Sequence, residues 1–274
     1  MCIVNSLDEY MEEKMSVIDR FKLDGKSGFI TGGARGIGKA LADAFIDAGA
    51  NIVIADIDIA EAKKTADGLA EKYNKKVVAV KCEVTNQKDA AEMVDRVVEE
   101  FGSIEIAVNN AGINAKGSAM DIDLETFRKI IDVNLNGVFV TAQAAARKMK
   151  ELGVKNGSII STASMSGHVA NYPQKLAAYC TSKGGVIMLT KVLALEWAEY
   201  GIRVNCVSPG YILTDLVKEM EGIDEMMKVW TPLTPLGRLG QTEDLTGIYV
   251  FLASDASGWV TGADYLVDGG YTVP

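Results

Sequence analysis

Tyr179 and Lys183 stand four residues apart in a stretch, residues 158–183, that also holds the only histidine of the chain. If Tyr179 lies on a helix, Lys183 lies one turn further along the same face. A tyrosine has an ordinary pKa of about 10, and a neighbouring ammonium that is held still would lower this value. The pair therefore predicts a phenol that can act as a general acid and base near neutral pH.

The same spacing recurs at Tyr10 and Lys14, so position must decide which pair does chemistry. Residues 1–20 are acidic and amphipathic, and we interpret them as an N-terminal extension, either a solvated helix or a loose arm. They contain no apolar segment typical of a signal peptide. The pair at Tyr179 is the one that follows a predicted nucleotide site.

From residue 21 onward, short apolar runs alternate with amphipathic segments. Continuous apolar runs without polar alternation are typical of parallel strands that are buried on both faces. Strands that alternate with helices predict a doubly wound α/β sheet with right-handed crossovers. The expected strands are residues 27–31, 51–56, 76–84, 104–109, 158–162, 203–207 and 264–267. The expected helices are residues 37–48, 59–73, 86–101, 124–152, 176–200 and 242–252.

We find no linker or internal repeat, so residues 21–274 are predicted to form a single domain. Residues 211–240 contain prolines, glycines and three methionines (Met220, Met226 and Met227) and form a long connection. A connection of this length in a compact fold is usually a lid or a binding loop with helical pieces of its own. We therefore predict a substrate lid at about residues 211–240.

Three glycines, Gly32, Gly36 and Gly38, follow the first predicted strand and precede a helix. Residues without a Cβ allow a tight turn in which backbone N–H groups and a helix N-terminus approach a pyrophosphate. Asp56 ends the second strand, where a carboxylate would accept hydrogen bonds from an adenosine ribose. The arrangement predicts a dinucleotide site, and the charge of Asp56 favours NAD over NADP. Arg35 could partner either a pyrophosphate or a 2′-phosphate.

With these residues in place, the chain resembles the short-chain dehydrogenase/reductase family. The resemblance rests on TGGARGIG at residues 31–38, NNAG at 109–112, Ser164 and the Tyr179/Lys183 pair, in the family's order. It implies a single Rossmann-type domain with a seven-stranded parallel sheet in the order 3-2-1-4-5-6-7, helices on both faces, and a homotetramer. By position, the resemblance also implies a set of cofactor contacts: Gly32, Arg35, Gly36, Ile37, Gly38, Asp56, Glu83, Val84, Asn110, Tyr179, Lys183, Pro209, Gly210, Ile212 and Thr214. Glu83 departs from the family, which commonly has an aspartate at this adenine contact.

The resemblance implies four catalytic residues. Tyr179 would exchange a proton with the substrate oxygen, and Lys183, together with the charge of an oxidised nicotinamide, would lower its pKa. Ser164 would hydrogen-bond the substrate oxygen, although Ser166 lies close by. Asn134 would kink its helix and hold a water that links Lys183 to solvent.

The segment SMSGHVANYPQ at residues 164–174 and the ending VDGGYTV are similar to those of family members that act on sugar alcohols, ketoses and gluconate. A polyol site needs several polar groups near the nicotinamide. We predict that the substrate contacts come from Ser164, Ser166, His168, Asn171, Gln174 and Tyr179. His168 could equally be a surface residue of the loop. The alternative substrate is a hydroxysteroid or other hydrophobic alcohol, which the methionines of the lid and Trp230 favour. The alternative function is that of a non-catalytic NAD-binding regulatory protein.

Composition excludes several other classes. The chain of 274 residues has a formal net charge of −9, which argues against nucleic acid and anionic membrane surfaces as partners. No apolar run approaches the length of a membrane span. Its four cysteines form no metal-binding pattern, and we predict reduced thiols in a cytoplasmic protein without a catalytic metal, with Cys82 and Cys206 buried in strands.

Overall fold

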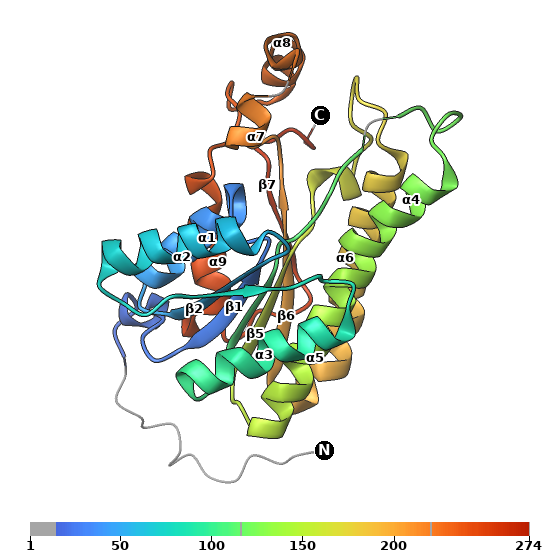
Figure 1. The fold of residues 1–274 in the computed structure, drawn as a ribbon. Helices are drawn as coiled ribbons and strands as arrows, with labels where there is room; N and C mark the ends of the chain where they lie inside the picture. The colour runs from blue at the N-terminus through green and yellow to red at the C-terminus, as the bar shows by residue number, and fades with distance from the viewer. Residues whose placement is uncertain (1–14, 116, 220, 274) are drawn as a thin grey trace.

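The computed structural model describes residues 15–115, 117–219 and 221–273. The Tyr10/Lys14 pair and Met220 lie outside the described residues. The described part forms a seven-stranded parallel sheet in the order β3-β2-β1-β4-β5-β6-β7, which confirms the predicted fold class (Figure 1). The strands are β1 (Ser27–Thr31), β2 (Asn51–Asp56), β3 (Val78–Lys81), β4 (Ile106–Asn109), β5 (Gly157–Thr162), β6 (Ile202–Pro209) and β7 (Asp264–Val267).

Apolar side chains on both faces of the sheet explain the unbroken apolar runs. Alternate strand residues point to opposite faces, so Ile30 belongs to one core cluster and its neighbour Phe29 to the other. The first cluster lies under α1 (Gly36–Asp47), α2 (Ile59–Tyr73) and α9 (Glu243–Ala253). The second lies under α3 (Gln87–Phe101), α5 (Gly137–Leu152) and α6 (Ala177–Trp197). Helices thus cover both faces (Figure 1).

The predicted helix over residues 124–152 consists of three parts. α4 (Leu124–Ile131) passes into a π-helical segment, Asp132–Asn136, and then into α5. A π segment adds one residue to the turn and bends the helix locally, and such segments are frequent at functional sites. Asn134, the predicted position of the kink, lies in the middle of it.

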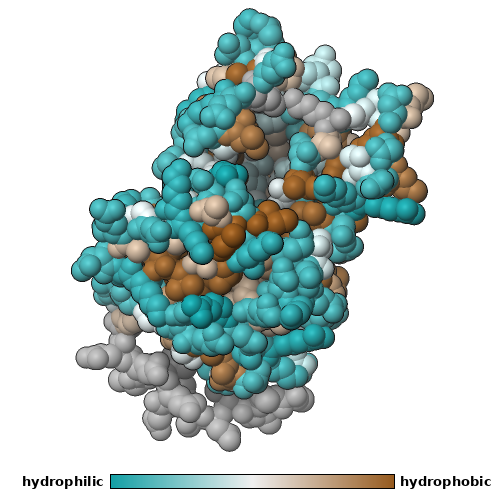
Figure 2. All heavy atoms as spheres, viewed as in Figure 1, coloured by the Kyte–Doolittle hydropathy of each residue, from teal (hydrophilic) through white to brown (hydrophobic). Residues whose placement is uncertain are grey.

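Residues 211–240, the lid segment, carry α7 (Asp215–Lys218) and α8 (Ile223–Leu233). α8 projects from one end of the molecule in Figure 1, and Figure 2 shows the surface hollowed beside it. Met226 and Met227 lie within α8, and Pro232 occupies its last turn. The lid segment follows β6, so it starts at the carboxyl edge of the sheet.

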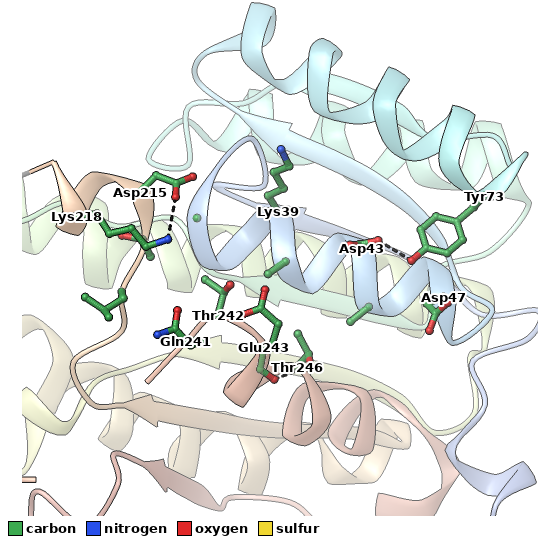
Figure 3. A pocket seen from close by; sticks show the side chains of 15 residues that line it. Lys39, Asp43, Asp47, Tyr73, Asp215, Lys218, Gln241, Thr242, Glu243 and Thr246 are labelled. Carbon is green, nitrogen blue, oxygen red and sulfur yellow. Dashed lines mark hydrogen bonds and ion pairs between the residues drawn. The ribbon is translucent and has the colours of Figure 1, made fainter. Parts of the chain in front are cut away.

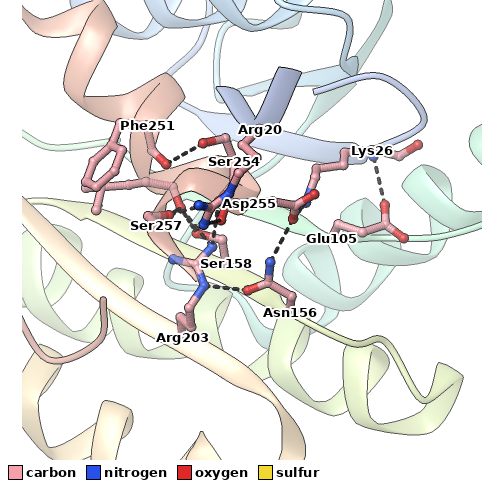
Figure 4. A network of polar contacts seen from close by, with 12 residues as sticks. Arg20, Lys26, Glu105, Asn156, Ser158, Arg203, Phe251, Ser254, Asp255 and Ser257 are labelled. Atoms are coloured by element: carbon pink, nitrogen blue, oxygen red, sulfur yellow. Dashed lines mark hydrogen bonds and ion pairs between the residues drawn. The ribbon is translucent and has the colours of Figure 1, made fainter. Parts of the chain in front are cut away.

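A buried polar network ties the opposite edge of the sheet together (Figure 4). Arg203, near the start of β6, donates to Asn156 Oδ1 (2.6 Å) and to the carbonyls of Leu252 and Ser254, where α9 ends. Arg203 is 6% exposed, and burial lowers its pKa to about 10. Cations at a helix C-terminus satisfy the last carbonyls. The network therefore fixes α9 against β5 and β6, away from the glycine turn.

One smaller prediction needs adjustment. Cys206 is buried within β6, whereas Cys82 is buried one residue beyond the end of β3. Among the described residues, no helix is both long enough and apolar enough to cross a membrane.

Candidate active site

The glycine turn joins β1 to α1 in a backbone conformation that needs residues without a Cβ. Gly32 and Gly36 have φ values of 61° and 54°, in the left-handed region. A Cβ on Gly38 would lie 2.1 Å from the Gly32 carbonyl oxygen. The first turn of α1 can therefore approach the end of β1 only with glycine at position 38.

α1 begins without a side-chain cap. Arg35 occupies the N-cap position and accepts no hydrogen bond from the helix, whereas α2, α3 and α4 are capped by Asp58, Asn86 and Asp123. The free N–H groups and the dipole at such a helix start favour an anion. The turn therefore fits the pyrophosphate of a dinucleotide.

Acidic side chains surround the position expected for the adenosine ribose. Asp56 Oδ2 accepts from the Ala34 N–H (3.1 Å), and Oδ1 accepts from the Asp58 N–H (3.0 Å). Arg35 pairs with Asp58 (2.7 Å) and lies 3.8 Å from Glu61. The one cation of the turn is thus already neutralised by carboxylates of the neighbouring helix.

Asn110 braces the glycine turn from β4. Its Nδ2 donates to the carbonyls of Thr31 (3.1 Å) and Gly32 (3.2 Å). Thr31 Oγ1 in return accepts the N–H groups of Asn110 and Ala111. The side chain of Asn110, predicted to contact the ribose, is occupied in shaping the turn.

The remaining predicted cofactor residues lie around the same edge. Thr214 caps α7 and approaches Gly36, where a Cβ would lie 3.4 Å from its methyl group. Pro209 ends β6, the Gly210 N–H donates to Val267 O, and Ile212 bridges to Gly240. On the other side, Glu83 accepts from the Thr85 hydroxyl (3.2 Å), and Val84 is buried against the second core cluster. Ile37 lies half-buried in the first turn of α1, behind the glycine turn.

Tyr179, Ser164 and Lys183 meet beyond the carboxyl end of β5. Ser164 is the second residue after β5, whereas Tyr179 and Lys183 lie in the first two turns of α6. Lys183 is 3% exposed, donates to the Thr162 carbonyl (2.6 Å), and its Nζ lies 5.7 Å from the centroid of the Tyr179 ring. The structure brings the three predicted side chains together.

Burial controls the electrostatics of this group. It raises the pKa of the half-buried Tyr179, and the hydrogen bond from Ser164 offsets only part of this effect. Burial also lowers the pKa of Lys183 to about 8. Burial is thus the largest influence on both groups, and the expectation that Lys183 together with an oxidised nicotinamide lowers the pKa of the phenol stays a prediction.

Asn134 is fully buried in the π segment, and both ends of its amide group are hydrogen-bonded. Its Oδ1 accepts from the Ile113 N–H (2.8 Å), and its Nδ2 donates to the Ile113 carbonyl (2.9 Å) and to Ser182 Oγ (3.2 Å). A Cβ on Gly112 would lie 3.3 Å from Asn134 Oδ1 and 3.7 Å from Lys183 Nζ. Asn134 thus fixes the segment after β4 beside Lys183, and the water predicted at Asn134 stays a prediction.

The predicted substrate residues are mostly engaged with protein groups. Ser166 is buried and pairs with Ser164 (Oγ to Oγ, 3.1 Å). His168 Nε2 lies 2.5 Å from the carboxylate of Asp264 at the start of β7. Asn171 and Gln174 both bond to the hydroxyl of Tyr211. The structure does not gather His168, Asn171 and Gln174 around Tyr179 as free donors.

Sequence reasoning missed four residues that shape the site. Thr31 acts through its hydroxyl and Thr162 through its backbone carbonyl, and such groups occur at many strand ends. The only sequence signal is their position, Thr31 just before the glycine turn and Thr162 two residues before Ser164. Asp58 reads as an ordinary helix cap, and Tyr211 as one aromatic residue of the lid segment. Their roles depend on contacts between segments that are distant in sequence.

A polar groove of about 460 Å³ runs along the outer side of α1 (Figure 3). Gly36 and Thr214 line one part of it, and Asp43, Tyr73 and Glu243 line other parts. None of the four side chains predicted to be catalytic lines this groove. The described residues contain no group of three or more histidine, cysteine, aspartate or glutamate side chains that could hold a metal ion.

Comparison with known proteins points to one family. A family model described as enoyl-(acyl carrier protein) reductase matches residues 32–272. The sorbose reductase of Candida albicans is 44% identical over 94% of this chain and 91% of its own length. An NADP-dependent mannitol dehydrogenase of Alternaria alternata is 40% identical over 93% of this chain and 95% of its own length.

Among solved structures, a short-chain type dehydrogenase/reductase from Mycobacterium marinum superposes with a TM-score of 0.90. It is 47% identical, and the match covers 94% of this chain and all of the other. The two relatives and this structure match nearly the whole chain, so the match includes both the glycine turn and the Tyr179 group.

Proposed function

Because the chain belongs to the short-chain dehydrogenase/reductase family, as its sequence predicts, we propose that it interconverts a secondary alcohol and a ketone with NAD(H) as cofactor. We further propose a sugar alcohol, ketose or sugar acid as substrate. The observation that carries the proposal is the meeting of Ser164, Tyr179 and Lys183 beside the glycine turn.

The residues of the chain bind the substrate oxygen and transfer the proton. The nicotinamide, when bound, supplies or takes up the hydride. Ser164 hydrogen-bonds the substrate oxygen and holds it near the Tyr179 hydroxyl. Tyr179 gives its proton to this oxygen during reduction and accepts one during oxidation. Lys183, held by Thr162 O, positions its ammonium beside the phenol.

The preference for NAD rests on charge. A 2′-phosphate on the adenosine ribose would approach Asp56, Asp58 and Glu61, whereas Arg35 is already paired. The mannitol dehydrogenase relative is NADP-dependent by name. We therefore propose that the acidic residues of β2 and α2 give this chain a different cofactor preference from that relative.

The substrate class rests on the resemblance of residues 164–174 to polyol dehydrogenases and on the sorbose reductase and mannitol dehydrogenase relatives. We also propose a cytoplasmic homotetramer as the working form. In support, Cys82, Cys180 and Cys206 are free thiols, and apolar side chains are exposed on α6.

One assay tests the function. NADH formation is measured with a panel of sugar alcohols, sugar acids and hydroxysteroids, for the wild type and for Tyr179→Phe. We expect turnover of at least one polyol, and a loss of about 10²–10⁴-fold in the variant, as for removal of a general acid–base. NAD binding, followed by fluorescence, should persist in Tyr179→Phe. Turnover of steroids alone would contradict the substrate class, and NAD binding without any turnover would favour a regulatory role.

A further inference from the structure

Tyr211 joins three segments that are far apart in the sequence. It is the second residue after β6, at the start of the lid segment. Its hydroxyl donates to Gln174 Oε1 (2.7 Å) and accepts from Asn171 Nδ2 (3.0 Å). Both partners belong to residues 163–176, the substrate loop, which leads from β5 to the catalytic helix α6.

The ring of Tyr211 makes a second set of contacts. It stacks on Trp230 of α8, with ring centroids 4.0 Å apart and planes 11° apart, and it meets the edge of Tyr271 at 5.3 Å. Stacked and edge-to-face pairs add to the stability gained from burial alone. One residue thus contacts the substrate loop through its hydroxyl and the lid and C-terminal segment through its ring.

The network continues to the catalytic helix. Asn171 Oδ1 accepts from the Cys180 thiol (3.5 Å), and Cys180 is the neighbour of Tyr179 in α6. The carboxamide of Asn171 therefore connects Tyr211 with the first turn of the helix that carries the acid–base residue.

Trp230 is the buried residue of α8 on which the ring of Tyr211 stacks. Among the described residues, Trp230 Nε1 is the one buried side-chain polar atom without a hydrogen-bond partner, and the residue is 2% exposed. An unpaired buried donor costs free energy. The stack on Tyr211 is the one aromatic contact that Trp230 makes with another described residue, so it holds α8 against the start of the lid segment.

We propose that Tyr211 is a positioning residue whose hydroxyl holds the substrate loop against the lid segment in the arrangement that receives the substrate. Asn171 and Gln174 then act on the shape of the site through Tyr211 and do not contact the substrate as free donors. The part of this proposal that concerns substrate rests on the proposed function, whereas the contact between loop and lid does not.

The first experiment needs no substrate. Hydrogen exchange is measured on the full chain for the wild type, Tyr211→Phe, Gln174→Leu and the double variant. Tyr211→Phe keeps the ring stack and removes only the hydroxyl. Loss of two hydrogen bonds predicts faster exchange, by about tenfold, in both the substrate loop and α8. The double variant should exchange at the rate of Tyr211→Phe, because that change already removes the bond to Gln174.

Tyr265→Phe is the matched control. Tyr265 lies on β7, and its hydroxyl bonds to no residue that the structure describes. Exchange in this variant should equal that of the wild type. Unchanged exchange in Tyr211→Phe, or a change in only one of the two segments, would overturn the proposed contact.

The second experiment uses the substrate identified by the polyol panel. In Tyr211→Phe, KM for this substrate should rise by about tenfold while the Kd for NAD stays within about twofold. An unchanged KM beside faster exchange would overturn the role in substrate positioning. If the wild type turns over nothing, the proposed function fails, and the exchange experiment still decides on the contact.

Discussion

At the scale of single residues, the site shows how strongly burial opposes charge. The Tyr179/Lys183 spacing suggests an ammonium that lowers the pKa of a phenol. In the structure, desolvation is the largest influence on both groups, and it raises the pKa of Tyr179 and lowers that of Lys183. An acid–base role at neutral pH therefore needs charge beyond the protein's own, which the oxidised nicotinamide supplies when bound.

Lys183 should make stability depend on pH. Its pKa is about 8 in the folded chain, against 10.5 for the free group. Between these values the unfolded chain binds a proton that the folded chain does not, so the free energy of unfolding rises with pH. Below pH 8 both states are protonated, and the cost of the buried charge is fully present.

We expect Lys183 to raise the free energy of unfolding by about 2 kcal/mol between pH 7.5 and pH 9.5. Urea unfolding of the wild type and of Lys183→Met at both pH values isolates it, because the other titrating groups are common to both proteins. Parallel pH profiles for the two proteins would show that Lys183 is not desolvated in this way.

The choice of cofactor should shift when Arg35 is released. In Asp58→Asn/Glu61→Gln, the asparagine can still cap α2 while both carboxylates that hold Arg35 are gone. We expect NADP to bind about fivefold to tenfold more tightly, an effect that salt should weaken, and NAD to bind almost as before. Titration of each cofactor into the protein measures both affinities.

Asp123→Asn is the control for this experiment. Asp123 caps α4 through the Thr126 N–H (2.7 Å), so the substitution removes one carboxylate from an equivalent cap elsewhere in the chain. It should leave both affinities unchanged. An unaltered ratio of NADP to NAD affinity in the double variant would assign selectivity to Asp56 alone.

At the scale of elements, sequence patterns predicted what depends on local structure. The limits of β1, β2, α2 and β7 agree with the predicted ones, because apolar runs and caps such as Asp58 mark them. The π segment at Asp132–Asn136 was not predicted, since five residues are too few for a change of helical period to show in the apolar pattern. The kink at Asn134 was expected only through the family resemblance.

The candidate site likewise contains a part that the sequence predicts and a part that depends on tertiary contacts. Ser164, Tyr179, Lys183 and the glycine turn could be predicted because their order along the chain is distinctive. The partners of His168, Asn171 and Gln174 could not, because Asp264 and Tyr211 reach them only through tertiary packing. A polar residue in a loop has the same sequence signal whether it binds a substrate or another loop.

Arg203 should contribute to stability and not to cofactor binding. Arg203→Met leaves Asn156 Oδ1 and the carbonyls at the end of α9 without their buried donor (Figure 4). We expect a loss of about 3 kcal/mol in the free energy of unfolding, measured with urea at pH 7. NAD affinity should stay unchanged, since this network lies at the opposite edge of the sheet from the glycine turn.

Arg238→Met provides the comparison. Arg238 pairs with Asp244 (2.6 Å), but its side chain is 55% exposed. Water screens an exposed ion pair, so its loss should cost much less than the loss of the buried network. Equal losses in the free energy of unfolding of the two variants would contradict the view that burial makes the contacts of Arg203 important for stability.

At the scale of the whole molecule, the exposed apolar side chains include two sets that concern its assembly. On α6, Met188, Val192 and Leu195 are spaced four and three residues apart and form one stripe. Elsewhere, Trp259 is fully exposed, and Leu266 lies on the edge strand β7. A helix that is apolar on both its inner and outer faces is usually buried, and an exposed apolar edge strand favours pairing with another chain. A closed tetramer of D2 symmetry requires two distinct surfaces that each pair with the same surface of another copy.

The α6 stripe should therefore hold one of two interfaces. We expect the wild type to have four times the chain mass of 29.3 kDa in solution, measured by light scattering after gel filtration. In Met188→Glu/Leu195→Glu, each added charge faces its symmetry copies across a two-fold axis, and desolvating it is costly. The mass should fall to that of a dimer, because the surface around Trp259 and β7 is untouched. Met120→Glu places the same charge on a residue that is 96% exposed in a loop, and it should leave the tetramer intact. A monomeric wild type, or a double variant that stays tetrameric, would show that this stripe does not join subunits.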